Sequence, residues 1–192
     1  MTTALLLMDF QNGITARLGE AARAPIAAAR RALDAARAAG IPVVFVRVGF
    51  REGFPEVARR NKAFGPMPAS ATAAHLIESA PATQIVAELA PEAGEPVVVK
   101  RRVGAFASDL DVVLRGAGAT DLVLAGISTS GVVLSTVRYA ADRDFGLTVL
   151  ADAVADGDDE VHRVLLEKVL PRQAEVLTVD EWVAQRAGAA SR

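Results

Sequence analysis

The chain has 192 residues, of which 52% are hydrophobic and 23% charged. This composition excludes intrinsic disorder, and the length predicts a single domain over residues 1–192. The formal net charge of −2 and the absence of cysteine exclude a strongly basic nucleic-acid-binding surface, disulfides, thiolate metal ligands and a cysteine nucleophile.

The apolar segments are too short to cross a membrane, because none approaches the ~20 residues that a spanning helix needs. The first residues, MTTALLLMDF, have no basic segment and reach Asp9 after a very short apolar stretch, unlike a secretory signal peptide. We therefore expect a cytoplasmic protein that acts on a small-molecule substrate and binds neither nucleic acid nor membrane.

The first predicted elements are a strand, a helix and a second strand. Residues 4–8, ALLLM, predict a buried strand that ends at Asp9. Residues 20–39 are rich in alanine and arginine and are followed by Gly40, a pattern typical of a helix with a glycine stop. Residues 43–46, VVFV, predict the second strand.

A long irregular segment follows at residues 48–80. It contains Gly53, Pro55, Gly65 and Pro66 and is too long for an ordinary connection between two elements. Long segments of this kind often form lids or binding loops. A surface excursion, or part of a subunit interface, is the alternative interpretation.

The rest of the chain alternates again between helices and strands. The predicted helices are residues 81–89, 106–115, 130–143 and 158–169, and the predicted strands are residues 97–99, 122–125, 147–150 and 175–177. Strands that alternate with helices predict a doubly wound α/β fold with right-handed crossovers.

Three features with chemical potential lie at the carboxyl ends of predicted strands, where open α/β sheets bind their ligands. Asp9 ends the first strand, Lys100 ends the third, and the segment 126–131, GISTSG, follows the fourth and opens a helix. A carboxylate and an ammonium at this edge can act as an acid–base catalyst and its charge partner. Taken singly, the same residues are typical of caps, solvated lysines and turns.

The segments LLLMDFQNG, VVKRRVGAF and LAGISTSGVVLSTVRYAADRDF resemble the signature segments of the isochorismatase-like, or cysteine hydrolase, superfamily. The resemblance implies a three-layer α/β/α sandwich with a six-stranded parallel sheet, in a homodimer or a larger homo-oligomer. It also implies that Asp9 and Lys100 are catalytic and that the peptide bond between Ile127 and Ser128 is cis.

The third catalytic position of that superfamily, a cysteine, corresponds to Val132 in this chain. Valine cannot attack a carbonyl, so amide hydrolysis through a thioester is excluded. Ser128, Thr129, Ser130 and Ser135 carry nearby hydroxyls, but none occupies the matched position, and hydroxyls ahead of a helix are more often N-caps. Ser130 is the best placed of the four.

The isochorismatases within the superfamily also lack the cysteine and hydrolyse a vinyl ether. By that resemblance Asp9 is the general acid, with a raised pKa, and Lys100 holds a substrate carboxylate or the developing charge. These isochorismatases have glycine where this chain has Val132, so the kind of mechanism transfers more safely than the substrate. The alternative is a catalytically silent member that binds a metabolite or a protein partner.

A metal site is not expected. Nicotinamidases of the superfamily bind a divalent ion through an Asp-x-His pair and a second histidine, whereas the corresponding stretch here is RVGF, residues 47–50. The only histidines, His75 and His162, lie far apart in sequence without a ligand pattern. We therefore expect a hydrolase without a cofactor.

The candidate substrate-binding residues come from the strand ends, from nearby phenylalanines and from the matched segments. They are Gln11, Phe50, Phe106, Ile127, Ser128, Gly131 and Val132. Gln11 has an alternative role, in which its amide bonds neighbouring backbone. Arg101 and Arg102 are candidates for steering an anion, with solvated side chains as the alternative.

Overall fold

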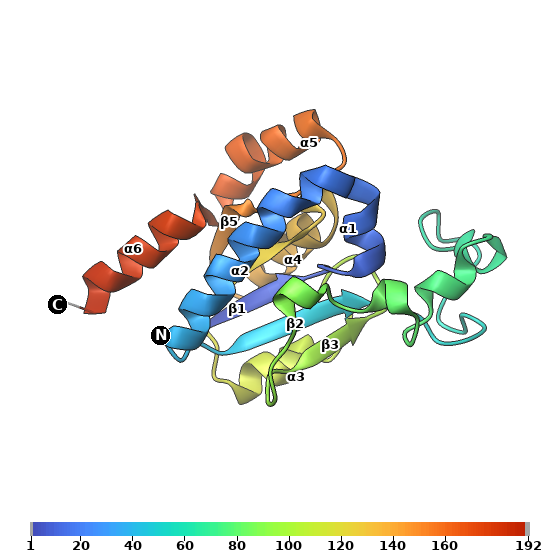
Figure 1. The fold of residues 1–192 in the computed structure, drawn as a ribbon, viewed down its shortest axis with the longest axis horizontal. Coiled ribbons are helices and arrows are strands. Elements are labelled where there is room, and N and C mark those ends of the chain that lie inside the picture. The colour runs from blue at the N-terminus through green and yellow to red at the C-terminus, as the bar shows by residue number, and fades with distance from the viewer. Residues whose placement is uncertain (1, 191–192) are drawn as a thin grey trace.

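The protein is built on a six-stranded parallel sheet with the strand order β3-β2-β1-β4-β5-β6, here in a computed structural model that describes residues 2–190 (Figure 1). The strands are β1 (Thr3–Met8), β2 (Val43–Val48), β3 (Val97–Lys100), β4 (Asp121–Ile127), β5 (Gly146–Ala155) and β6 (Glu175–Leu177). The order reverses between β1 and β4, which is the arrangement of a doubly wound fold. All six predicted strands are present.

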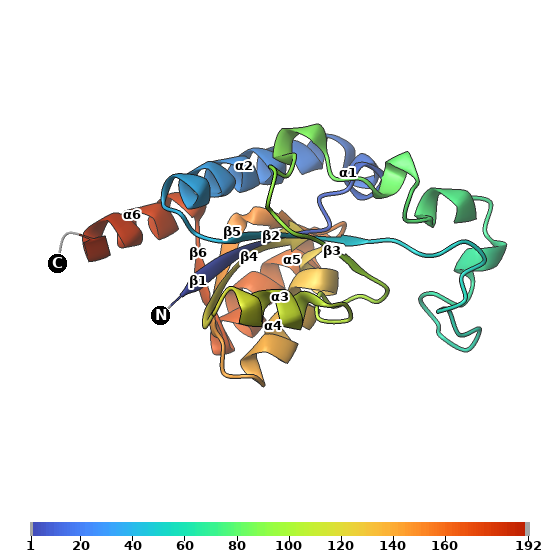
Figure 2. The ribbon, with the colours of Figure 1, turned by 90° about the horizontal axis from the view of Figure 1, so that it is seen from below.

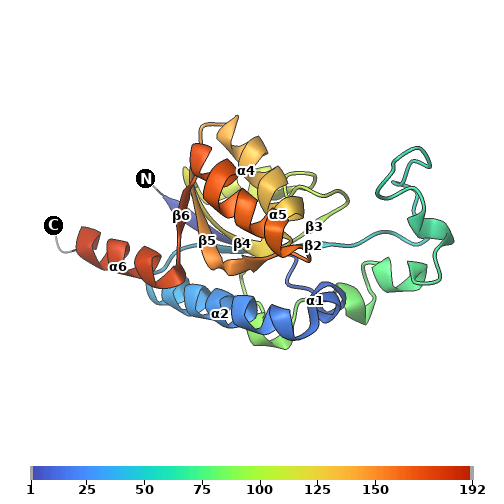
Figure 3. The same ribbon diagram turned by 90° about the horizontal axis from the view of Figure 1, so that it is seen from above.

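Helices cover both faces of the sheet (Figures 2 and 3). They are α1 (Asn12–Leu18), α2 (Arg23–Ala38), α3 (Leu110–Gly116), α4 (Leu134–Ala141), α5 (Asp159–Val164) and α6 (Val179–Ala190). Helices α1, α2 and α6 lie on one face and α3, α4 and α5 on the other, and each face has its own buried apolar cluster. This confirms the predicted α/β/α sandwich.

The central strands are buried on both faces because crossover helices cover them. In β1, every residue from Ala4 to Met8 is almost inaccessible to solvent, which explains its uninterrupted apolar sequence. Helix α2 presents one apolar face to this sheet, made of alanines and one leucine: Ala28, Ala29, Ala32, Leu33 and Ala36. Its small side chains let the helix pack closely on the strands.

Two helix predictions in the first half of the chain need correction. The predicted helix 20–39 begins as α2 at Arg23, after a 3₁₀ turn at Gly19–Ala22, and a separate helix, α1, precedes it. The predicted helix 81–89 is instead two 3₁₀ turns, Pro81–Thr83 and Ala87–Leu89. The segment pairs with the residues after β1, since Val86 N–H donates to the Phe10 carbonyl at 2.9 Å, and these bonds replace those of a helix.

Of the helices predicted in the second half, one is shorter than expected, because α3 begins at Leu110 rather than at 106. The other two are helical over nearly the predicted ranges, with a π-helical turn at Thr129–Val133 before α4 and another at Leu165–Val169 after α5. Helix α6 was not predicted. Ala105 N–H donates to the Thr136 hydroxyl at 3.2 Å, which keeps the chain before α3 bound to α4 instead of helical.

The long segment between β2 and the 3₁₀ turn at Pro81 forms an arm, defined here as residues 49–80, that extends beyond the sheet (Figures 1 and 2). It has a small apolar core of its own, built on Phe50, Phe54 and Phe64. A parallel bridge between Phe50 and Ile77 closes the base of the arm. The arm is therefore a folded substructure.

Within residues 2–190, no helix is long and apolar enough to cross a membrane.

Candidate active site

The carboxyl ends of β1, β3 and β4 meet around a cavity of about 410 Å³. Asp9 follows β1, Lys100 ends β3, and the turn after Ile127 follows β4. The lining residues are Asp9, Ile14, Arg17, Leu18, Val48, Phe64, Lys100, Arg102, Val103, Ile127, Ser128, Gly131 and Val132. The parallel sheet thus brings four of the substrate-binding candidates from the sequence together around the pair Asp9 and Lys100: Ile127, Ser128, Gly131 and Val132.

Asp9 and Lys100 form a buried ion pair. The Lys100 Nζ lies 2.8 Å from the Asp9 Oδ2, and the two side chains are only 2% and 6% exposed. The ammonium also donates to the carbonyls of Arg102 at 3.0 Å and Val103 at 2.9 Å. Three acceptors therefore surround the three N–H groups of Lys100, as a buried ammonium requires.

The other carboxylate oxygen of Asp9, Oδ1, is buried and has no hydrogen-bond partner among the described residues. Burial raises the pKa of Asp9 from 3.8 to about 6, against the attraction of Lys100, which lowers it. A carboxyl group with this pKa exchanges its proton near neutral pH.

The backbone also holds Asp9 in place. Its φ of 58° lies in the left-handed region, which non-glycine residues rarely adopt, although aspartate does so more often than most. The Asp9 N–H donates to the Val46 carbonyl of β2 at 2.8 Å. This backbone geometry turns the chain sharply at the end of β1.

The turn after β4 forms another wall of the cavity. The peptide bond between Ile127 and Ser128 is cis, as expected from the sequence. Ser128 Oγ accepts from the Gly131 N–H at 3.1 Å, and a Cβ at Gly131 would lie only 2.6 Å from that oxygen. Val132 is 2% exposed and contributes an apolar surface where the sequence resemblance places a nucleophile.

The hydroxyl groups near this turn are arranged differently from the expectation. Ser130, the best-placed candidate from sequence, is exposed and outside the residues that line the cavity. Its N–H donates to Asp156 Oδ2 at 2.7 Å. Ser128 does line the cavity, but its Oγ caps the following turn. Thr129 is fully buried and its hydroxyl lies 2.8 Å from His162 Nδ1.

Gln11 has the structural role that the sequence analysis kept as an alternative. Its Nε2 donates to the carbonyls of Val48 and Thr83 at 2.7 Å each, and its Oε1 accepts from the Val48 N–H at 2.8 Å. The amide thus joins the end of β2 to the segment after the arm, and its polar atoms are engaged by backbone.

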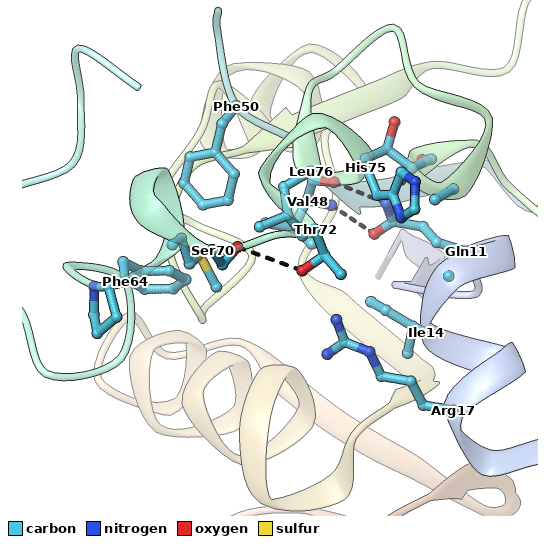
Figure 4. A pocket seen from close by; sticks show the side chains of 15 residues that line it. Gln11, Ile14, Arg17, Val48, Phe50, Phe64, Ser70, Thr72, His75 and Leu76 are labelled. Carbon is cyan, nitrogen blue, oxygen red and sulfur yellow. Dashed lines mark hydrogen bonds between the residues drawn. The ribbon is translucent and has the colours of Figure 1, made fainter. Parts of the chain in front are cut away.

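A second cavity, of about 460 Å³, lies between α1 and the arm (Figure 4). Gln11 and Phe50 line it, and Phe50 also packs on Phe54 and Phe64 of the arm. Phe106 is not brought to either cavity. Its ring lies 4.7 Å from that of Tyr139 on α4, which makes it a packing residue.

Arg17 lines both cavities, and the sequence analysis missed it. It lies on α1, a helix that was not predicted. Ile14 and Leu18 are four residues apart and come soon after Asp9, which ends the first strand. This spacing is the signal that would have indicated a short helix with one face turned inward.

The two arginines after β3 connect the sheet to the arm. Arg101 contacts Glu56 at 3.2 Å and also pairs with Glu78, so two carboxylates neutralise its charge. Arg102 donates to the Glu56 carbonyl at 2.7 Å and its guanidinium lies over the Phe64 ring. These contacts fix the arm against the loop that follows Lys100.

The two histidines are not brought together. His75 lines the second cavity, whereas His162 on α5 contacts Thr129. The described residues contain no group of three or more histidines, cysteines, aspartates or glutamates that could hold a metal ion. The expectation of a hydrolase without metal or cofactor stays a prediction.

Comparison with known proteins adds independent findings. A family model described as "Isochorismatase domain" matches residues 3–181. The chain is 35% identical over 183 residues to the uncharacterized isochorismatase family protein YecD of Escherichia coli O157:H7, covering 94% of each. It is 34% identical to the ureidoacrylate amidohydrolase RutB of Stutzerimonas stutzeri, covering 82% of this chain and 71% of the relative.

Two solved structures illustrate the similarity in fold. An isochorismatase family protein from Burkholderia thailandensis has a TM-score of 0.84 and 28% identity, covering 95% of this chain and 94% of that one. N-carbamoylsarcosine amidase from Thermoplasma acidophilum has a TM-score of 0.76 and 26% identity, covering 94% and 98%. The similarity therefore extends over the whole sheet and its helices.

Proposed function

Because the chain belongs to the isochorismatase family, we propose that it is a hydrolase that acts on a small molecule without a covalent intermediate, with Asp9 as the general acid. The observation that carries this proposal is the buried Asp9 carboxyl beside Lys100, with an unpartnered Oδ1 and a pKa raised to about 6. A thioester route is closed because the chain has no cysteine.

The proposed reaction is hydrolysis of a vinyl ether. Asp9 in its neutral form gives its proton to the terminal carbon of the double bond, and the substrate becomes an oxocarbenium ion. Water adds to this cation and returns a proton to the Asp9 carboxylate, after which the hemiketal breaks into a carbonyl compound and an alcohol. Lys100 stabilises the Asp9 carboxylate during the interval between the two proton transfers.

Ile127 and Val132 are proposed as apolar walls around the reacting bond, together with Ser128 and Gly131 of the same turn. Val132 lines the cavity and is only 2% exposed, so the substrate must fit beside its two methyl groups. This restricts the width of the group that can approach Asp9.

The first test is pyruvate release from isochorismate by the wild-type protein and by Asp9→Asn. We expect a loss of about 100-fold or more in kcat/KM. Asp34→Asn is the matched control, because Asp34 is an exposed partner of Arg30 on α2, away from the cavity. Release that persists in Asp9→Asn would contradict the proposal.

The pH dependence tests the same role without a mutation. Only the protonated form of Asp9 is a general acid, and a pKa of about 6 leaves about a tenth of it protonated at pH 7. We expect kcat/KM to fall as the pH rises through about 6. An activity that rises over this range would assign Asp9 the role of a base.

The alternative is a member of the family without turnover that binds a metabolite or a protein partner. One observation favours it: Lys100 already has three acceptors, as in an ion pair that serves only the structure. No turnover across a panel of vinyl ethers and esters, together with saturable binding of one of them, would support this alternative. In either case we propose a homo-oligomer, from the sequence resemblance, and a cytoplasmic location, from the composition and the first residues of the sequence.

A further inference from the structure

The two cavities adjoin along a shared wall. Ile14, Arg17, Val48 and Phe64 line both of them. One cavity contains the Asp9–Lys100 pair, and the other extends between α1 and the arm. A ligand whose reacting bond lies at Asp9 can therefore extend past Arg17 into the second cavity.

The charges on the lining residues are unevenly distributed. Among the described residues that line either cavity, Asp9 is the only carboxylate, and Lys100 pairs with it. The guanidinium of Arg102 donates to two carbonyls, those of Arg101 and Glu56. In the described part of the chain, the side chain of Arg17 has neither an ion pair nor a hydrogen bond, so its charge is free to attract an anion.

The position of Arg17 suits contact with a ligand. Its guanidinium extends from α1 into the cavity and points towards Thr72 on the arm (Figure 4). The hydroxyls of Ser70 and Thr72 lie 3.4 Å apart on the same cavity. One donates to the other, which leaves the second hydroxyl able to donate to a ligand oxygen. The remaining walls are mostly apolar, with Ile14, Val48, Phe50, Phe64, Met67 and Leu76 among them.

We propose that Arg17 binds the carboxylate of a substrate whose body is apolar and occupies the cavity between α1 and the arm. The inference rests on the proposed function for the location of the reacting bond. It transfers the task of holding a substrate carboxylate from Lys100, whose N–H groups are engaged, to Arg17, whose N–H groups are not. A guanidinium suits this task because it presents two parallel N–H groups to a carboxylate.

The test measures binding and needs no turnover. Phenylacetate and its neutral amide, phenylacetamide, are the probes, titrated by NMR into the wild-type protein and its variants. We expect the wild-type protein to bind phenylacetate about tenfold more tightly than phenylacetamide. Arg17→Gln should abolish this preference, and Arg17→Lys should keep part of it.

Arg23→Gln is the matched control. It removes the same charge from an exposed arginine that pairs with Glu20 and lies outside both cavities, so it should keep the preference. Three outcomes would overturn the proposal. The preference for phenylacetate could survive in Arg17→Gln, it could be lost equally in Arg23→Gln, or the wild-type protein could bind neither probe.

The two proposals fail separately in this design. Asp9→Asn should retain the preference for phenylacetate, because Arg17 binds the anion and Asp9 acts on a different bond. If Asp9→Asn keeps turnover while Arg17→Gln loses the preference, the general-acid role fails and the carboxylate site stands.

Discussion

The carboxyl group of Asp9 is subject to two opposing influences. Burial favours its neutral form, whereas Lys100 at 2.8 Å favours the charged form, and the result is a pKa raised from 3.8 to about 6. The native state therefore binds a proton that the unfolded chain releases between these two values. Proton binding at this residue is linked to folding.

This linkage predicts a pH-dependent contribution to stability. Because the native pKa lies above the unfolded one, the contribution of Asp9 is fully present below pH 3.8 and is lost as the pH rises through about 6. The size of the loss is about 3 kcal/mol. Urea unfolding of the wild-type protein and Asp9→Asn between pH 4 and 7 measures it. Parallel profiles for the two proteins would contradict the prediction.

Sequence reasoning identified the charged residues of the site but not their complete setting. Asp9 and Lys100 were predicted because each ends an apolar run, and parallel strands place their carboxyl ends at one edge. Arg17 was missed because it lies on a helix of only seven residues, about two turns, which has no long apolar period. The role of Gln11 depends on carbonyls 37 and 72 residues away, which no local pattern encodes.

At the scale of elements, the turn after β4 depends on one side chain. Ser128 accepts the Gly131 N–H and so satisfies a donor that the first turn of a helix leaves free. We expect Ser128→Ala to lower the free energy of unfolding by about 1 kcal/mol. Ser130→Ala is the control, since Ser130 is exposed two residues away, and equal effects of the two substitutions in urea unfolding would refute the assignment.

The arm is fixed to the sheet by charged contacts around Glu56. This carboxylate contacts Arg101 at 3.2 Å, and the adjoining backbone carbonyl accepts from Arg102. We expect Glu56→Gln to increase hydrogen exchange about tenfold at the amides of Phe54 and Gly65, because local opening of the arm becomes easier. Global unfolding should change little.

Glu52→Gln is the control for the arm, because Glu52 is exposed and forms no ion pair within residues 2–190. Unchanged exchange at the arm amides of Glu56→Gln would show that the apolar core of the arm holds it in place without the charged contacts.

Element boundaries were predicted less well than the elements themselves. The apolar run LTVL marked the start of β5, but the strand continues to Ala155 through Asp152, which accepts from the Val179 N–H at 2.8 Å. The segment 81–89 has helical residues, but its backbone bonds to Phe10 and Asn12 instead. In both cases a distant partner determines the local structure.

At the scale of the whole molecule, the sheet depends on close contact between its two central strands. A Cβ at Gly126 would lie 2.6 Å from the Met8 carbonyl oxygen and 2.9 Å from the Met8 Cβ. We expect Gly126→Ala to destabilise the protein by about 3 kcal/mol.

The control is Gly116→Ala at the end of α3, where a Cβ meets nothing within 4 Å and where alanine should change stability by at most about 1 kcal/mol. The midpoint temperatures of thermal unfolding of Gly126→Ala and Gly116→Ala, each relative to the wild-type protein, compare the two substitutions directly. A Gly126→Ala protein as stable as Gly116→Ala would show that β1 and β4 can separate without cost.

The architecture itself could be predicted because the alternation of short apolar runs with helical stretches runs through most of the chain. The handedness of crossovers then leaves few topologies open. The extent of the arm could be predicted, as the irregular segment 48–80, but not its internal fold, since its core forms from phenylalanines scattered among glycines and prolines. Its direction depends on contacts of Glu56 and Phe64 with residues after β3.

The closed base of the arm has a consequence for how such proteins diversify. The bridge between Phe50 and Ile77 brings the two ends of the arm together on the sheet side, so the chain between them can gain or lose residues without shifting the strands. Every such change reshapes the outer wall of the cavity between α1 and the arm and leaves Asp9 and Lys100 where they are. Proteins with this fold can therefore differ in the length of one segment and in the shape of this cavity, while the edge of the sheet is kept.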